Sequence, residues 1–143
     1  MTCVSGSYAA PTPAADTAVR GRKILVVDDE PMIRKFIESS LRAGGYEEVI
    51  FGTNGGCVPK LALQESPQLI IMDVMMPGGN GMRAYRNLKS TSETAGIPVI
   101  MTSGFNVMAV DANPENPPGP LLPKPFTAGR LLEEVNRAFA ATV

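Results

Sequence analysis

Short, uninterrupted apolar runs that recur along the chain constrain its fold more than any other feature of the sequence. Runs of this kind are typical of strands that are buried on both faces, as in a parallel sheet. Five of them are present, at residues 24–27, 49–51, 69–72, 98–101 and 121–122. Segments with helical periodicity lie between the runs, and this alternation predicts a doubly wound α/β domain with a five-stranded parallel sheet.

Apolar spacing and helix-capping residues predict where the helices lie. The first helix begins at Pro31 and ends at Gly44-Gly45. A second helix is expected at 56–65, where Pro59 is tolerable only in the first turn. Two more are expected, one at 82–90 and a last one that carries Leu131, Leu132, Val135 and Phe139 on one face.

Prolines disturb one further helix position, between the fourth and fifth predicted strands. This segment, 104–120, contains Pro114, Pro117, Pro118 and Pro120. Because a helix interior does not accommodate proline, we expect at most residues 105–112 to be helical and 113–120 to be irregular. The predicted fold therefore has a shortened or irregular fourth helix.

Length and charge limit the domain organisation and the partners. The 143 residues, 15.1 kDa in mass, fit one folded domain, which we place at residues 22–143. Residues 1–21 are small, polar and proline-containing, and they predict a disordered N-terminal tail. A net charge of -1 offers no attraction for nucleic acid or an anionic membrane, and no apolar run is long enough to span a bilayer. We therefore expect no nucleic-acid partner and no membrane association.

The absence of histidine and the small number of cysteines exclude several kinds of chemistry. The sequence contains no histidine, which excludes Ser-His-Asp and Cys-His catalysis and histidine-ligated zinc. Cys3 and Cys57 lie far apart, and we interpret them as neither a disulfide framework nor a zinc site, with Cys57 as an ordinary small side chain. This use of cysteine is typical of a reducing cytoplasm, which is the location that we predict.

Polar residues gather where the predicted strands end, at Asp28, Asp29, Asp73, Thr102 and Lys124. Ligands of an open parallel sheet bind beyond the carboxyl ends of its strands. A cluster of carboxylate oxygens suits Mg²⁺, and a lysine and a hydroxyl can stabilise charge on a phosphoryl group. Asp73 stands alone at its strand end and is the candidate nucleophile, while Asp28 and Asp29 can hold the ion.

Four motifs at these strand ends resemble the receiver domain of two-component response regulators. They are VVDDE, MDVMMPGGNGM, VIMTSG and LPKPF, and the resemblance covers residues 23–140. It implies the flavodoxin-like strand order 2-1-3-4-5. It also implies that Asp73 is the phosphoacceptor and that Thr102 and Lys124 contact the phosphoryl group.

The same resemblance implies the ligands and partners of the site. Asp28, Asp29, Asp73 and the backbone carbonyl of Met75 would bind Mg²⁺, and Lys124-Pro125 would be a cis peptide. A histidine kinase or a phosphotransfer protein would donate the phosphoryl group. Because the chain ends soon after its last helix, we expect a stand-alone receiver that signals through altered protein contacts with a downstream target. We expect no enzymatic activity beyond self-phosphorylation and autodephosphorylation.

Two other functions stay open. An aspartate-nucleophile phosphatase uses a similar set of side chains, but that family needs a second aspartate two residues after the nucleophile, where this chain has Met75. A pseudo-receiver would bind its partners constitutively. It is favoured by two departures from the family, the proline-rich 113–120 and Leu121, which stands where receivers often have an aromatic residue. With Leu121 there, we expect activation to pass through Thr102 and the backbone of 103–107.

Overall fold

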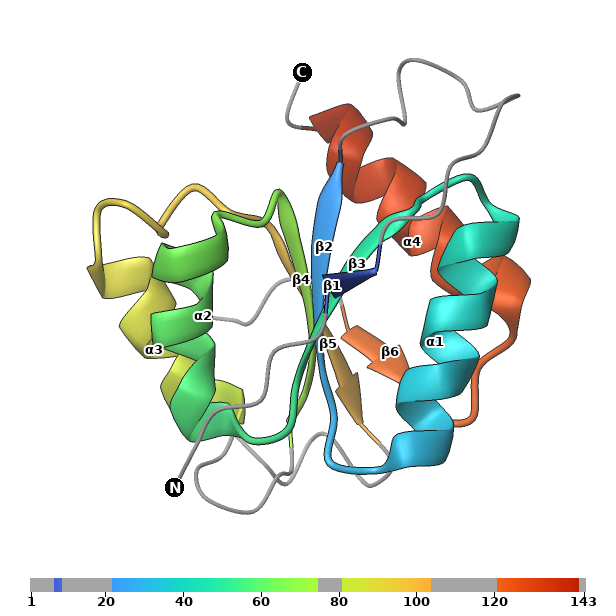
Figure 1. Ribbon diagram of the computed structural model, residues 1–143, viewed down its shortest axis with the longest axis horizontal. Coiled ribbons are helices and arrows are strands. Elements are labelled where there is room, and N and C mark those ends of the chain that lie inside the picture. The colour runs from blue at the N-terminus through green and yellow to red at the C-terminus, as the bar shows by residue number, and fades with distance from the viewer. Residues whose placement is uncertain (1–6, 9–21, 75–80, 104–120, 142–143) are drawn as a thin grey trace.

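A parallel sheet forms the centre of the structure, as the apolar runs predict (Figure 1). The computed structural model describes residues 7–8, 22–74, 81–103 and 121–141. Its parallel strands are β2 (Lys23–Val27), β3 (Glu48–Gly52), β4 (Leu69–Asp73), β5 (Val99–Ser103) and β6 (Leu121–Pro123). They lie in the order β3-β2-β4-β5-β6, which confirms the predicted order 2-1-3-4-5.

Of the helices in the described residues, the first three lie within two residues of their predicted bounds, and no bounds were predicted for the last. The helices are α1 (Pro31–Ala43), α2 (Val58–Glu65), α3 (Gly81–Ser90) and α4 (Ala128–Ala141), with a 3-10 turn, η1 (Gly55–Cys57), before α2. Proline occupies the first turn of both α1 and α2, where its missing N–H needs no partner. Gly45, directly after α1, has φ of 96°, a backbone conformation that glycine adopts without strain.

The two faces of the sheet carry separate apolar layers. Helices α2 and α3 cover one face, and α1 and α4 cover the other (Figure 1). Alternate residues of each strand point to opposite layers, so Leu25 packs under α2 and α3 whereas Ile24 packs under α1 and α4. Both are fully buried, which explains why the strands read as unbroken apolar runs.

Several sequence-based expectations lie outside the described residues. These include the short helix at 105–112, the irregular segment 113–120 and the loop that holds Met75. The boundary between a tail at 1–21 and a domain at 22–143 stays a prediction. Among the residues that the structure does describe, no helix is both long enough and apolar enough to cross a membrane.

A short strand near the N-terminus was not predicted. Strand β1 (Ser7–Tyr8) pairs antiparallel with β3, opposite Ile50 and Val49, and so adds a sixth strand at the edge of the sheet. The sequence gives no signal for it, because two polar or aromatic residues form no apolar run and their partners lie about forty residues away.

Cys57 is disulfide-bonded, which corrects the interpretation of the cysteines as unpaired. The large separation of Cys3 and Cys57 in the sequence is the reason why no disulfide bond was predicted. Within the described residues, Ser7 and Tyr8 pair with β3, and the chain continues from β3 through η1 to Cys57. Cys57 is also 3% exposed and belongs to the apolar layer under α2 and α3.

Two leucines of α2 provide a matched test of this packing. Leu61 is 2% exposed and Leu63 is 50% exposed. We expect Leu61→Ala to lower the free energy of unfolding by about 2–5 kcal/mol, because it leaves a cavity, and Leu63→Ala by less than about 1 kcal/mol. Urea denaturation followed by circular dichroism measures both losses. Equal losses would contradict this orientation of α2.

Candidate functional site

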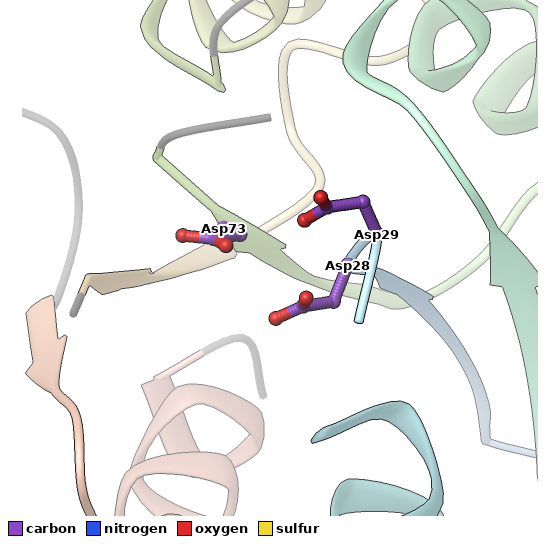
Figure 2. A group of neighbouring side chains, drawn as sticks. All are labelled: Asp28, Asp29 and Asp73. Atoms are coloured by element: carbon purple, nitrogen blue, oxygen red, sulfur yellow. The ribbon is translucent and has the colours of Figure 1, made fainter. Parts of the chain in front are cut away.

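The polar residues singled out in the sequence meet at the carboxyl edge of the sheet. Strand β2 connects to β3 on one side, and the chain then crosses to β4 on the other side of β2. This reversal leaves a crevice between the ends of β2 and β4, where ligands of such sheets bind. Asp28 and Asp29 follow β2 and Asp73 ends β4, so all three lie at the neighbouring ends of these two strands (Figure 2).

The three carboxylates form a compact cluster. One oxygen of each lies within 4.8 Å of the corresponding oxygen of the others. Asp28 and Asp73 are buried, whereas Asp29 is exposed. Carboxylates this close repel one another, so the cluster needs positive charge nearby.

Lys124 supplies part of that charge. Its ammonium donates hydrogen bonds to Asp28 Oδ2 at 3.0 Å and to Asp73 Oδ2 at 3.1 Å. The side chain of Lys124 is 12% exposed, so these bonds form largely away from water. One lysine against three carboxylates still leaves the cluster with net negative charge.

The pKa of Lys124 follows from this environment. Burial disfavours the charged ammonium and lowers the pKa, but the hydrogen bonds and the attraction of Asp28 and Asp73 outweigh burial, so the pKa lies above the ordinary 10.5. The lysine therefore stays charged throughout the neutral range. Its contribution to stability is fully present below pH 10.5 and is lost only as the pH rises through the raised value.

Thr102 lies beside Asp73 with its hydroxyl buried. The two residues are direct partners in the register of β4 and β5, and Val74 N–H donates to the Thr102 carbonyl at 2.8 Å. Thr102 is 1% exposed, and among the described residues Thr102 Oγ1 has no hydrogen-bond partner. A buried hydroxyl without a hydrogen-bond partner is unfavourable. The Thr102 hydroxyl would therefore stabilise an oxygen-rich group bound at Asp73 by donating a hydrogen bond to it.

The donor set fits a hard divalent cation such as Mg²⁺. Among the residues that the structure describes, all the side-chain ligands of the cluster are carboxylate oxygens. Mg²⁺ prefers oxygen ligands and keeps several waters, which the exposed position of Asp29 allows. The carbonyl of Met75, the fourth predicted ligand, lies outside the described residues.

Three residues that the sequence analysis did not single out support the cluster. Glu30 N–H donates to Asp28 Oδ1 at 2.9 Å, and its carboxylate lies 3.7 Å from Lys124 Nζ. Arg34 donates to the Asp28 carbonyl at 3.0 Å. Gly81 N–H donates to the Val74 carbonyl at 2.7 Å and closes the loop after β4. Glu30 and Gly81 had a signal in the sequence, because they lie in the motifs VVDDE and MDVMMPGGNGM.

The end of β6 completes the site. Lys124 follows this strand, and the peptide bond Lys124-Pro125 is cis, as the resemblance implied. The structure thus brings together all five side chains that the sequence picked out, namely Asp28, Asp29, Asp73, Thr102 and Lys124.

Fold and site together define a doubly wound α/β domain with an acidic cluster at the switch point of its sheet. The sequence pattern of the response regulator receiver domain matches residues 24–136. The chain belongs to this family of two-component signalling domains.

Individual relatives agree with this assignment. The chemotaxis protein CheY of Bacillus subtilis is 32% identical over 115 residues, which is 80% of this chain and 95% of CheY. Protein PilH of Pseudomonas aeruginosa is 41% identical over 81 residues, 57% of this chain and 66% of PilH. The receiver domain of a Pseudomonas aeruginosa sensor histidine kinase, solved with magnesium in its active site cleft, is 27% identical with a TM-score of 0.71. That comparison covers 84% of this chain and 98% of the other.

Gly81→Ala tests the close packing beneath the acidic cluster. A Cβ at this position would lie 2.3 Å from the Asp73 carbonyl oxygen and 2.9 Å from Val74 Cα. Because backbone atoms cannot move aside as a flexible side chain can, we expect the midpoint of thermal unfolding to fall by about 4–10 °C.

Gly96→Ala is the matched control, since a Cβ there would meet nothing within 4 Å. Differential scanning calorimetry compares the two variants. A neutral Gly81→Ala, or an equal loss in Gly96→Ala, would be inconsistent with the packing at Gly81.

Proposed function

We propose that this chain is a phosphorylation-dependent signalling switch that accepts a phosphoryl group on Asp73 from a histidine kinase or a phosphotransfer protein. The observation that carries the proposal is the position of the Asp73 carboxylate, which lies within 4.8 Å of two other carboxylates and 3.1 Å from Lys124 Nζ. A carboxylate held between a cation site and a fixed ammonium is a suitable acceptor for a phosphoryl group.

The chemistry assigned to the residues is a direct displacement. An oxygen of Asp73 attacks the donor phosphorus, the bond from phosphorus to the donor nitrogen breaks, and the donor imidazole keeps that electron pair. Asp28, Asp29, Asp73 and the Met75 carbonyl would hold Mg²⁺, which when bound neutralises charge on the phosphoryl oxygens. Lys124 is already hydrogen-bonded to Asp73 and can pair with one such oxygen, and the Thr102 hydroxyl can donate to another.

The donor would approach over an apolar groove beside the site. The groove has a volume of about 470 Å³ and is lined by Glu30, Ile33, Phe36, Lys124, Pro125 and Phe126. Lys124 and Glu30 belong to both the groove and the acidic site. Met32, one residue before Ile33 in the first turn of α1, is 83% exposed. A protein that covers this groove would lie next to Lys124, which is hydrogen-bonded to Asp73.

Several further features belong to the same proposal. The phosphoryl group is added and lost at Asp73 without turnover of another substrate, and the signal leaves through altered contacts with a downstream protein.

A phosphatase role is disfavoured by Met75 at the position of the required second aspartate. A constitutive pseudo-receiver is disfavoured by the complete set of acidic, hydroxyl and lysine side chains. The proposed location is the cytoplasm, where kinases draw on ATP.

Intact mass spectrometry after incubation with acetyl phosphate and Mg²⁺ tests the acceptor. We expect one phosphoryl adduct on the wild-type chain and none on Asp73→Asn. Asp29→Asn should need roughly tenfold more Mg²⁺ for the same yield, because one carboxylate ligand is lost. The exposed Glu133→Gln makes the same carboxylate-to-amide change far from the cluster and should behave as wild type.

An adduct that survives in Asp73→Asn would refute the acceptor assignment. Mg²⁺-independent binding of partners, with no adduct, would favour the pseudo-receiver. Hydrolysis of a small phosphomonoester over many turnovers, dependent on Asp73, would favour the phosphatase.

Met32→Glu tests the donor surface. The substitution places a charge on the exposed face of α1, and glutamate is well tolerated in the first turn of a helix. We expect transfer from a phosphohistidine protein that serves the wild-type chain to slow by roughly tenfold, while phosphorylation by acetyl phosphate is unchanged. Leu63→Glu, on α2 at the opposite face, is the control. Equal rates for both variants would place the donor elsewhere.

A further inference from the structure

Asp29 differs from the other two members of the acidic cluster in how its carboxylate is held. Asp28 and Asp73 are buried and both accept hydrogen bonds from Lys124. The Asp29 carboxylate is exposed, yet one of its oxygens lies within 4.8 Å of an oxygen of each of the others (Figure 2). We propose that Arg34, in α1, is a positioning residue. It fixes the peptide unit that leads into Asp29 and so holds this carboxylate ready for a divalent cation.

Two hydrogen bonds hold the peptide units on either side of Asp29. Arg34 Nη1 donates to the Asp28 carbonyl at 3.0 Å, which holds the unit before Asp29. Glu30 N–H donates to Asp28 Oδ1 at 2.9 Å, which holds the unit after it. Because peptide units are planar, the orientations of these two units determine the backbone dihedral angles of Asp29. The direction of the Asp29 side chain follows from those angles, so it depends on Arg34.

Helix α1 gives Arg34 a rigid base. Its own N–H donates to the Glu30 carbonyl at 3.1 Å, a hydrogen bond of the first helical turn. Three residues further on, Ile37 is 1% exposed and belongs to the apolar layer under α1 and α4. Side chains of a helix lean toward its N-terminus, which is the direction that Arg34 takes to reach the Asp28 carbonyl. The packed helix therefore determines where the guanidinium lies.

The charge of Arg34 would act on the cation site in the opposite sense. Lys124 is the residue that pairs with the carboxylates of Asp28 and Asp73, whereas Arg34 donates to a main-chain carbonyl. A positive charge near the cluster repels a divalent cation. If Arg34 acted through its charge, removal of the guanidinium would strengthen cation binding. If it acts through position, removal weakens binding, so the sign of the change separates the two roles.

Preorganisation explains why position matters for Asp29. An exposed aspartate on a loosely held backbone loses conformational freedom when it binds an ion, and that loss opposes binding. A residue whose flanking peptide units are already held loses less. Contacts that orient metal ligands without touching the metal typically change its affinity by about ten- to a hundredfold. This role of Arg34 rests on the cation site of the proposed function and does not depend on phosphoryl transfer.

Substitutions in the full chain separate position from charge. Arg34→Met and Arg34→Gln both remove the guanidinium, and both replacements are good helix formers. Arg34→Lys keeps the charge and a donor that can bond to a carbonyl. Lys35→Met is the matched control, because it removes a unit charge from the exposed neighbouring position of α1.

Titration of the ¹⁵N-labelled chain with MgCl2, followed through amide chemical shifts, measures the Kd for Mg²⁺ without any phosphoryl donor. We expect Kd to rise roughly tenfold in Arg34→Met and Arg34→Gln. Arg34→Lys should recover most of the affinity, and Lys35→Met should bind as tightly as wild type or more tightly. ¹⁵N relaxation should show a lower order parameter for the Asp29 amide in Arg34→Met, with the amides of β5 as the reference.

Equal Mg²⁺ affinity in wild type and both guanidinium-free variants would overturn this role of Arg34 and leave the cation site intact. Tighter binding in those variants would assign Arg34 an effect of charge and would also overturn it. An unchanged order parameter at Asp29, or an equal loss of affinity in Lys35→Met, would do the same. A wild-type chain that binds no Mg²⁺ would overturn both the cation site and the role of Arg34.

Discussion

The contact between Lys124 and the two buried aspartates is the interaction on which the rest of the site depends. Asp28 follows β2 and Asp73 ends β4, and the ammonium that lies 3.0 to 3.1 Å away balances the charge of these two buried carboxylates. Because burying an unpaired charge is very unfavourable, this ammonium permits two acidic groups to stand in neighbouring strands. The exposed Asp29 adds negative charge that a divalent cation can balance.

The architecture places this contact where a ligand can reach it. Two apolar layers hold the strands rigidly from both faces, so chemistry is confined to the strand ends. The reversal of strand order between β2 and β4 lies at the carboxyl edge of the sheet, where ligands of such sheets bind. Thr102, one strand further along, places a buried hydroxyl beside the same edge.

The sequence predicted those strands and site residues that are marked by a local pattern of apolar and polar residues. Apolar runs marked the strands, and the polar residues at their ends therefore marked the site, from Asp28 to Lys124. The strand order came from the family resemblance, since periodicity does not encode order. Gly81 lies in a quoted motif, but its packing role was not predicted, because that role comes from the approach of the Asp73 backbone, a tertiary contact. The disulfide at Cys57 was missed because β1 carries no apolar signal and pairs with a distant strand.

The two edges of the sheet are unequal. At one end lies β6, three residues long and finished by Pro123, which has no N–H to offer a neighbour. At the other lies β3, five residues long, and among the described residues β1 pairs with two of its residues, Val49 and Ile50. Backbone N–H and C=O groups at the edge of a sheet offer another strand a place to pair. The sheet therefore has its longer edge at β3, on the side of β2 away from Asp73.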